Sequence, residues 1–242
     1  MLSLSRRSSR LPFGAAVARC LCCLAVVLGV VAALFARQPV YLASAQDVAT
    51  PGRPGEAMPS YPGDWNTFFG SSTEDDARGV ARFGDNAVYY VGTSYSTWGN
   101  PIRPFIGGGD AEYPASDAYV VKTDNAGNII WNTFLGGDAR DAAYAVAVDG
   151  AGNVYVYGFS GLGWGTPLST HTVASDVFVA RLNPAGQLIW LRFLGDNGEQ
   201  YGEDMVVDSD GNAYVAGYSR ASWGTPIRPF TDSFPPLDGF VA

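Results

Sequence analysis

The chain repeats one segment three times, and this repetition constrains its fold more than any other feature. The copies run from Trp65 to Gly92, from Trp131 to Gly158 and from Trp190 to Gly217, each over 27 steps without an insertion. A second block without gaps begins at Asp117 and at Asp176 and reaches the next tryptophan after 14 steps. A fixed period of this size is typical of repeat architectures, in which each copy forms one structural unit.

Each repeat contains four short runs rich in β-branched and aromatic residues, without helical periodicity. AYAVAV (143–148) and NVYVYG (153–158) flank the sequence DGAGN, while DVFVARL (176–182) and QLIWLRFL (187–194) flank NPAGQ. Asp, Asn and Gly suit the tight turn of a β-hairpin. The pattern therefore predicts an all-β fold, a β-propeller built of four-stranded antiparallel blades.

In such a blade, 143–148 is the innermost strand and 187–194 is the outermost. The tight turns then share one face, and the segment around each repeated Trp-Gly pair shares the opposite face with the acidic loops. Between copies, only the Trp-Gly segment varies in length. We expect this segment, 100–116 in the first copy, to be a surface loop that tolerates shortening, and we expect its face to carry any local function.

The first 45 residues have the order of a secretory signal. Residues 1–19 carry four arginines and no acidic residue, 20–36 are uncharged, and Ala43-Ser44-Ala45 has the small-x-small form of a cleavage site. We predict a signal peptide over 1–45, cleaved before Gln46, with an uncleaved membrane anchor as the alternative. The mature protein would then be secreted or held at the cell surface, without a stable membrane span.

Removal of this segment changes the composition of the chain. All three cysteines lie within residues 20–23, so the mature chain would have neither thiol chemistry nor disulfides. Five of the 15 basic residues also lie in 1–45, so the net charge would change from −8 to about −13. Such a surface repels nucleic acids and anionic membranes. Residues 46–60 are rich in Pro and Gly and predict a linker, and 61–242 predict the propeller repeats.

Three of these segments resemble the bacterial SBBP β-propeller repeat. The matching sequences are WNTFLGG (131–137), AVAVDGAGNVYVYG (145–158) and DVFVARL (176–182), and the resemblance extends over residues 65–242. It implies an extracytoplasmic propeller of seven blades without a shared catalytic motif. The first copy departs from the pattern at Phe83, which replaces the Asp that begins the hairpin turn in the other copies.

Two isolated features suggest chemistry but fit simpler explanations. Asp208 to Asn212 resembles the opening of a calcium loop, but the glutamate that such a loop needs would fall at Ser219. We interpret the segment as a hairpin turn and predict neither a metal site nor a cofactor. His171 is the only histidine, and no repeated position supplies the partners of a catalytic base. We interpret it as an exposed loop residue and predict no catalytic residue.

Three acidic clusters fall on or near the variable-loop face: Glu74-Asp75-Asp76, Asp138-Arg140-Asp141 and Glu199-Glu203-Asp204. A pair of carboxylates at such a place would suit a polysaccharide hydrolase or lyase. However, Asp75 and Asp141 align with Gln200, so the acidic positions are not matched between copies. We interpret the clusters as a solvated acidic rim and keep the carboxylate-dependent enzyme as an alternative.

A tryptophan precedes glycine in the variable segment of every copy, at Trp98, Trp164 and Trp223. Exposed tryptophans stack on sugar rings, so these three residues are candidate ligand-binding residues of a lectin-like module. The alternative is that each ring packs its loop against the neighbouring blade. The other tryptophans, which are interpreted as structural, lie in predicted strands at Trp65, Trp131 and Trp190.

The sequence thus predicts an exported, non-catalytic propeller repeat protein that presents loops for binding or adhesion at the cell surface, with a protein or glycan as its unknown ligand. It begins with an outermost-type strand at Trp65 and ends after DGFVA (238–242), so about three blades are present. Propellers usually have about 4–8 blades. We therefore expect an incomplete propeller, either lacking C-terminal blades or completed by self-association of short chains.

Overall fold

The structure is a computed structural model that describes residues 65–108, 114–172, 175–196, 198–231 and 237–242. The predicted signal peptide (1–45) and linker (46–60) lie outside these residues. In the described ranges the secondary structure consists of eleven β-strands without a helix. This part of the chain therefore holds no helix that is long and apolar enough to cross a membrane.

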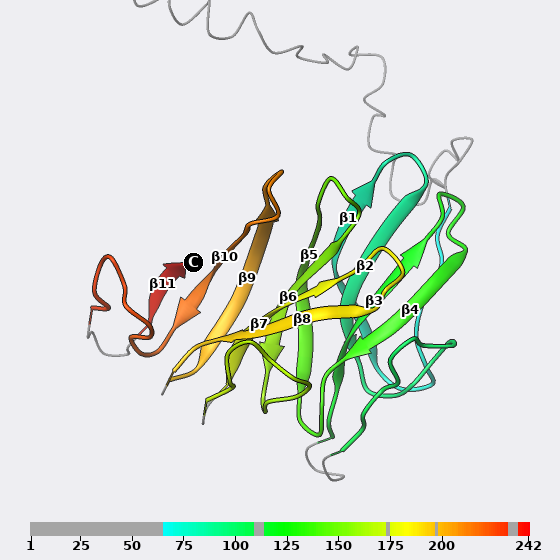
Figure 1. Ribbon diagram of the computed structural model, residues 1–242. Helices are drawn as coiled ribbons and strands as arrows, with labels where there is room; N and C mark the ends of the chain where they lie inside the picture. The colour runs from blue at the N-terminus through cyan, green and yellow to red at the C-terminus, as the bar shows by residue number, and fades with distance from the viewer. Residues whose placement is uncertain (1–64, 109–113, 173–174, 197, 232–236) are drawn as a thin grey trace, which may run out of the picture. The chain divides into compact units, whose positions relative to one another are not determined.

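The strands form three antiparallel sheets that follow one another along the chain (Figure 1). The first sheet contains β1 (Asp75–Phe83), β2 (Ala87–Ser94), β3 (Asp117–Thr123) and β4 (Ile129–Leu135). The second contains β5 (Asp141–Val148), β6 (Val154–Ser160), β7 (Asp176–Leu182) and β8 (Leu188–Leu194). The third contains β9 (Gln200–Val207), β10 (Ala213–Ser219) and β11 (Asp238–Val241).

Each sheet is a meander in which strands adjacent in sequence are adjacent in space. The first two sheets have four strands, and the third has three among the residues described. This order confirms the predicted fold class, so we call the sheets the first, second and third blade. The first strands of successive blades contact each other, β1 with β5 and β5 with β9.

Two of the three hydrophobic clusters among the described residues form layers between the blades, and the third surrounds Trp98 in the first blade. One layer joins the first and second blades through side chains such as Tyr89, Val120 and Phe178. The other joins the second and third blades through side chains such as Tyr157, Val179 and Met205. The second blade is therefore covered on both faces, which explains why β6 and β7 are almost continuously apolar.

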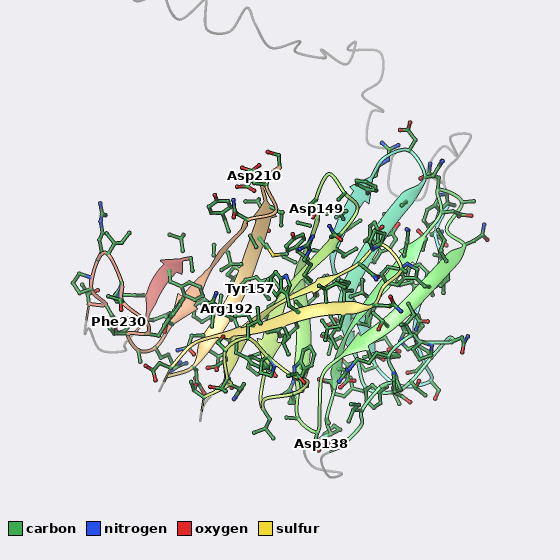
Figure 2. The ribbon with its side chains drawn as sticks, in the orientation of Figure 1. Asp138, Asp149, Tyr157, Arg192, Asp210 and Phe230 are labelled. Atoms are coloured by element: carbon green, nitrogen blue, oxygen red, sulfur yellow. The ribbon has the colours of Figure 1, made fainter. Side chains whose placement is uncertain are left out.

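The tight turns that begin with Asp or Asn share one geometry, and the turn after Phe83 in the first blade departs from it, with Gly84 at a φ of +58°. In the turn from Asp149 to Asn153, the Asp149 carboxylate accepts the backbone N–H groups of Ala151 and Asn153, both at 2.9 Å, and Gly152 takes a φ of +82°. Asp208 accepts the same hydrogen bonds from residues 210 and 212, which confirms the hairpin interpretation of that segment. Asp149 and Asp210 lie at the opposite end of the blades from Asp138, which belongs to the variable-loop face (Figure 2).

The leading tryptophans connect the outer strands to turns. Trp131, in β4, donates its indole N–H to the carbonyl oxygen of Pro184 in the outer turn of the second blade, at 3.2 Å. Its ring lies against Gly186 of that turn. Trp65 makes the equivalent hydrogen bond to Asn125, at 2.7 Å. The prediction that Trp65 lies in a strand is wrong, however, because residues 65–70 pair with no sheet and the Trp65 side chain is 41% exposed.

Trp131→Ala should lower the free energy of unfolding by about 2–4 kcal/mol, because it removes a large, partly buried ring and its contact between blades. Trp190→Ala is the matched control, since Trp190 has the equivalent place in β8 but no such turn as a partner among the described residues. We expect a smaller loss for this variant. Urea denaturation of both variants measures the difference, and equal losses would contradict a role of the Trp131 ring in joining the blades.

The variable segment of the first copy is not a free loop. Backbone hydrogen bonds join Ile102 to Asn132 at 2.9 Å and Phe134 to Arg103 at 3.1 Å, so the segment runs beside β4. The Arg103 guanidinium also donates to the carbonyl oxygens of Phe134 and Gly136, at 3.0 and 2.6 Å. The shorter segment of the second copy makes an equivalent hydrogen bond, from Leu168 to Leu191 at 2.7 Å. The expectation that 100–116 tolerates shortening therefore stays a prediction for the residues that follow Arg103.

Candidate ligand pocket between the first two blades

The first strand of every blade contains a β-bulge at the same repeat position. In β1, Ala77 pairs with Gly92 and Gly79 pairs with the adjacent Val91, so Arg78 between them has no partner in β2. The equivalent extra residues are Tyr144 in β5 and Glu203 in β9. A bulge bends its strand and redirects the side chain of the extra residue. At the seam between the first two blades, this places the Arg78 guanidinium 5.1 Å from the centre of the Tyr144 ring.

A glycine opposite each bulge makes this geometry possible. Gly92, Gly158 and Gly217 end the three repeat copies, and each pairs with the residue that precedes the extra residue of the bulge. A Cβ atom on any of them would overlap a carbonyl oxygen of the neighbouring strand. Glycine therefore recurs at this repeat position because the backbones of the two strands approach each other too closely for a Cβ atom.

Beside the bulges, on the variable-loop side, lies a cavity of about 230 Å³ between the first and second blades. Its walls combine charged, hydroxyl and aromatic side chains from both blades. The first blade and its loops contribute Glu74, Asp76, Arg78, Thr93, Tyr95 and Ser116, and the second contributes Arg140, Ala142, Tyr144 and Phe159. We call this cavity the seam pocket.

Two small residues explain why the pocket opens at this seam. At the next seam, between the second and third blades, Phe159 and Tyr201 stack with their ring centres 6.1 Å apart and their planes at 3°. The equivalent positions at the first seam are Thr93 and Ala142. Small side chains at both positions leave space where the next seam is filled with two rings, so the pocket follows from a local departure from the repeat.

The charges in the seam pocket are partly paired. Arg78 donates to Asp76 through Nε and Nη2, at 2.9 and 2.6 Å. Burial raises the pKa of Asp76, but the hydrogen bonds from Arg78 and Thr93 and the charge of Arg78 together outweigh this effect and leave the pKa below its ordinary value. Arg140 donates to the Tyr95 hydroxyl at 3.4 Å. Within the described ranges, neither Arg140 nor Glu74 forms an ion pair.

Thr93 adds a buried hydroxyl without a partner. Thr93 is 5% exposed, and its Oγ1 atom lies near the Asp76 carboxylate without forming a well-aligned hydrogen bond. A buried polar group without a partner is costly, and in native proteins it often marks a place that a ligand or water satisfies. The seam pocket therefore has both unpaired charges and an unsatisfied hydroxyl, which suits the binding of a polar molecule.

The structure buries two of the three candidate ligand-binding tryptophans. Trp98 and Trp164 are 8% and 6% exposed, and each packs edge-to-face against two aromatic rings of the third and fourth strands of its own blade. Burial favours packing over stacking on a sugar for these two residues. The Trp98 ring packs within its own blade, whereas the Trp164 ring also contacts the neighbouring first blade, with the Arg103 guanidinium 5.1 Å from its centre. Trp223 is partly exposed and packs against Phe240.

The acidic clusters are not a uniformly solvated rim. Glu74 and Asp138 are exposed, but the Asp141 side chain is fully buried. Asp141 accepts the backbone N–H of Gly137 at 2.9 Å and contacts the Ser160 hydroxyl. The prediction of a solvated rim is therefore wrong for Asp141. A buried carboxyl cannot reach a polysaccharide, so Asp141 does not fit the acid or base of a hydrolase or lyase either.

A second buried carboxyl, which the sequence did not single out, lies beside Asp141. Asp117 accepts the backbone N–H of Ile106 at 2.9 Å, and its Oδ1 atom has no partner. The two carboxyls approach each other across Gly136, where a Cβ atom would meet both. Burial raises the pKa of each carboxyl to about 7. At the next seam, Asp176 of the second blade and Gln200 of the third occupy the equivalent positions around Gly195.

His171 is not the exposed loop residue that was predicted. Its ring packs edge-to-face on Phe193 with 5.2 Å between ring centres, and its Nε2 atom lies 3.1 Å from the carbonyl oxygen of Ser160. These partners position the ring within the second blade. Among the described residues, no group of three or more His, Cys, Asp or Glu side chains is placed to hold a metal ion.

The fold and the repeated bulge define the chain as a β-propeller repeat protein. Residues 189–222 match the family model of the SBBP beta-propeller repeat. The matched segment runs from β8 through β9 and β10, and it confirms the resemblance found in the sequence. No curated protein matches the chain.

Proposed function

We propose that this chain is an exported, non-catalytic propeller repeat protein that binds a ligand at or beyond the cell surface through its variable-loop face, with the seam pocket as the binding site. The observation that carries the proposal is the opening of this pocket by Thr93 and Ala142, where the next seam is closed by Phe159 and Tyr201. The fully buried Asp141 supports binding over carboxylate catalysis. The signal-like segment 1–45 supports export.

Binding to cell envelopes tests the proposal. The full chain, produced and exported by its own cells, is incubated with envelope preparations from those cells, and bound protein is measured by sedimentation. The double variant Thr93→Phe, Ala142→Tyr introduces at the first seam the two rings that already stack at the second. We expect binding by the natural chain and its loss in the variant, with the circular dichroism spectrum unchanged.

Equal binding by the natural chain and the filled variant would contradict the seam pocket as the site. The same preparation tests export, because we expect its intact mass to begin at Gln46. A product that retains Met1 would contradict cleavage of the signal segment.

A further inference from the structure

We infer that the seam pocket binds an uncharged sugar residue, so that the protein recognises a neutral glycan; this inference rests on the proposed binding function. The glycan would insert one sugar ring between the first and second blades. The site differs from the repeated tryptophans, because its polar groups come from strand ends and bulges and not from Trp98 or Trp164.

The charges of the pocket favour a ligand without net charge. Its walls contain two carboxylates, Glu74 and Asp76, and two guanidinium groups, Arg78 and Arg140. The opposite charges balance, and Asp76 is already held by Arg78. An anion would face the remaining carboxylate of Glu74 and the negative charge of the whole chain, −8, whereas a cation would face Arg140. A neutral polar molecule is repelled neither by the carboxylate of Glu74 nor by the guanidinium of Arg140.

The hydrogen-bonding groups match the hydroxyls of a sugar. Each sugar hydroxyl donates and accepts, so it needs both kinds of partner nearby. Glu74 accepts, Arg140 donates, and the hydroxyls of Thr93 and Tyr95 do both. The Thr93 hydroxyl, which is buried without a partner, is the group that gains most from a bound hydroxyl.

The shape of the pocket also suits a sugar ring. A cavity of about 230 Å³ lies below the usual range of about 300–1,000 Å³ for small-molecule sites, so it admits one ring and not an extended ligand. Phe159 and Ala142 supply an apolar wall for the C–H groups of the ring. The arrangement therefore favours a single sugar unit of a longer glycan that continues into solvent.

A glycan array tests the inference directly. The full exported chain is applied to arrays of neutral glycans, uronic-acid glycans and phosphorylated glycans, and a hit is then titrated calorimetrically with the free saccharide. We expect binding to neutral glycans only. Thr93→Phe, Ala142→Tyr should abolish it, and Thr93→Val, which removes the hydroxyl but keeps the size of the side chain, should weaken it about two- to tenfold.

The outcomes separate this inference from the proposed function. The natural chain could bind envelopes through the seam pocket without competition from neutral saccharides. That result would overturn the proposal of a sugar ligand but keep the proposed binding function. Preference for uronic-acid or phosphorylated glycans would overturn the neutral charge of the ligand. Neutral-glycan binding that survives in the filled variant would overturn the seam pocket as its site.

Discussion

Gly158→Ala should destabilise the protein by about 3 kcal/mol or more, or prevent it from folding. Gly158 lies in β6, opposite the bulge of β5, where an added Cβ would overlap the carbonyl oxygen of Ala142 and touch the Phe178 ring. Relief would require β5 and β6 to separate, but the second blade is packed on both faces. Overpacking in such a place costs more than it would at an edge, because the neighbours cannot move away.

Gly150→Ala is the matched control for this prediction. Gly150 lies in the turn between the same two strands, and a Cβ there would meet no atom within 4 Å. We expect its free energy of unfolding to stay within about 0.5 kcal/mol of that of the natural chain. Urea denaturation followed by fluorescence measures both. A cost for Gly158→Ala as small as that for Gly150→Ala would contradict the close backbone approach at the bulge.

The free energy of unfolding should fall as the pH rises from about 4 to about 7, because of Asp117 and Asp141. Burial raises the pKa of both carboxyls from 3.8 to about 7 in the folded protein. Between these values the unfolded chain loses the protons and the folded chain keeps them, so raising the pH favours unfolding. The slope is about 1.4 kcal/mol per pH unit for each carboxyl that stays protonated, and it vanishes above pH 7.

The hydrogen bonds around Asp141 agree with a neutral carboxyl. The Ser160 hydroxyl contacts Asp141 and also lies 2.6 Å from the carbonyl oxygen of Leu162. The hydroxyl has one proton to share between these two oxygen atoms, so a protonated Asp141 would let both contacts be hydrogen bonds at once. In the third copy, Gln200 takes this place and donates through Nε2 to Ser219, which donates to Ala221. The amide thus acts as the protonated acid does.

Asp141→Asn should therefore reduce the pH dependence and stabilise the protein at pH 8, by at most about 4 kcal/mol. The converse variant, Gln200→Glu, should add a similar slope at the third blade, because it places an ionisable group at the equivalent buried position. Denaturation curves from pH 4 to pH 8 measure both effects. An unchanged slope in Asp141→Asn would show that Asp141 is ionised in the folded protein.

Much of the fold could be predicted from the sequence, because it follows from the repeat. The 27 steps from Trp131 to Gly158 span an outer strand and the inner hairpin of the next blade, and the turn Asp149 to Asn153 specifies that hairpin. The strand at Trp65 was predicted wrongly for the same reason. Its sequence matches β4 and β8, but strand formation also needs a neighbouring strand, and residues 65–70 have none in the sheets described.

The candidate site was harder to predict, since it depends on departures from the repeat. Alignment of the copies places Thr93 with Phe159 and Ala142 with Tyr201, but only the structure shows that these positions meet across a seam. The bulge that directs Arg78 is likewise invisible in a pattern of alternating residues. The acidic side chain of Asp141 suggested solvent exposure, whereas packing of the adjacent segments buries it.

The most direct test of the central claim is a crystal structure of the full exported chain with a neutral glycan that it binds. We predict electron density for one sugar ring in the seam pocket, between Thr93 and Ala142, with its hydroxyls near Glu74 and Arg140. Density for the bound glycan against the partly exposed ring of Trp223, with the seam pocket unchanged, would contradict the account.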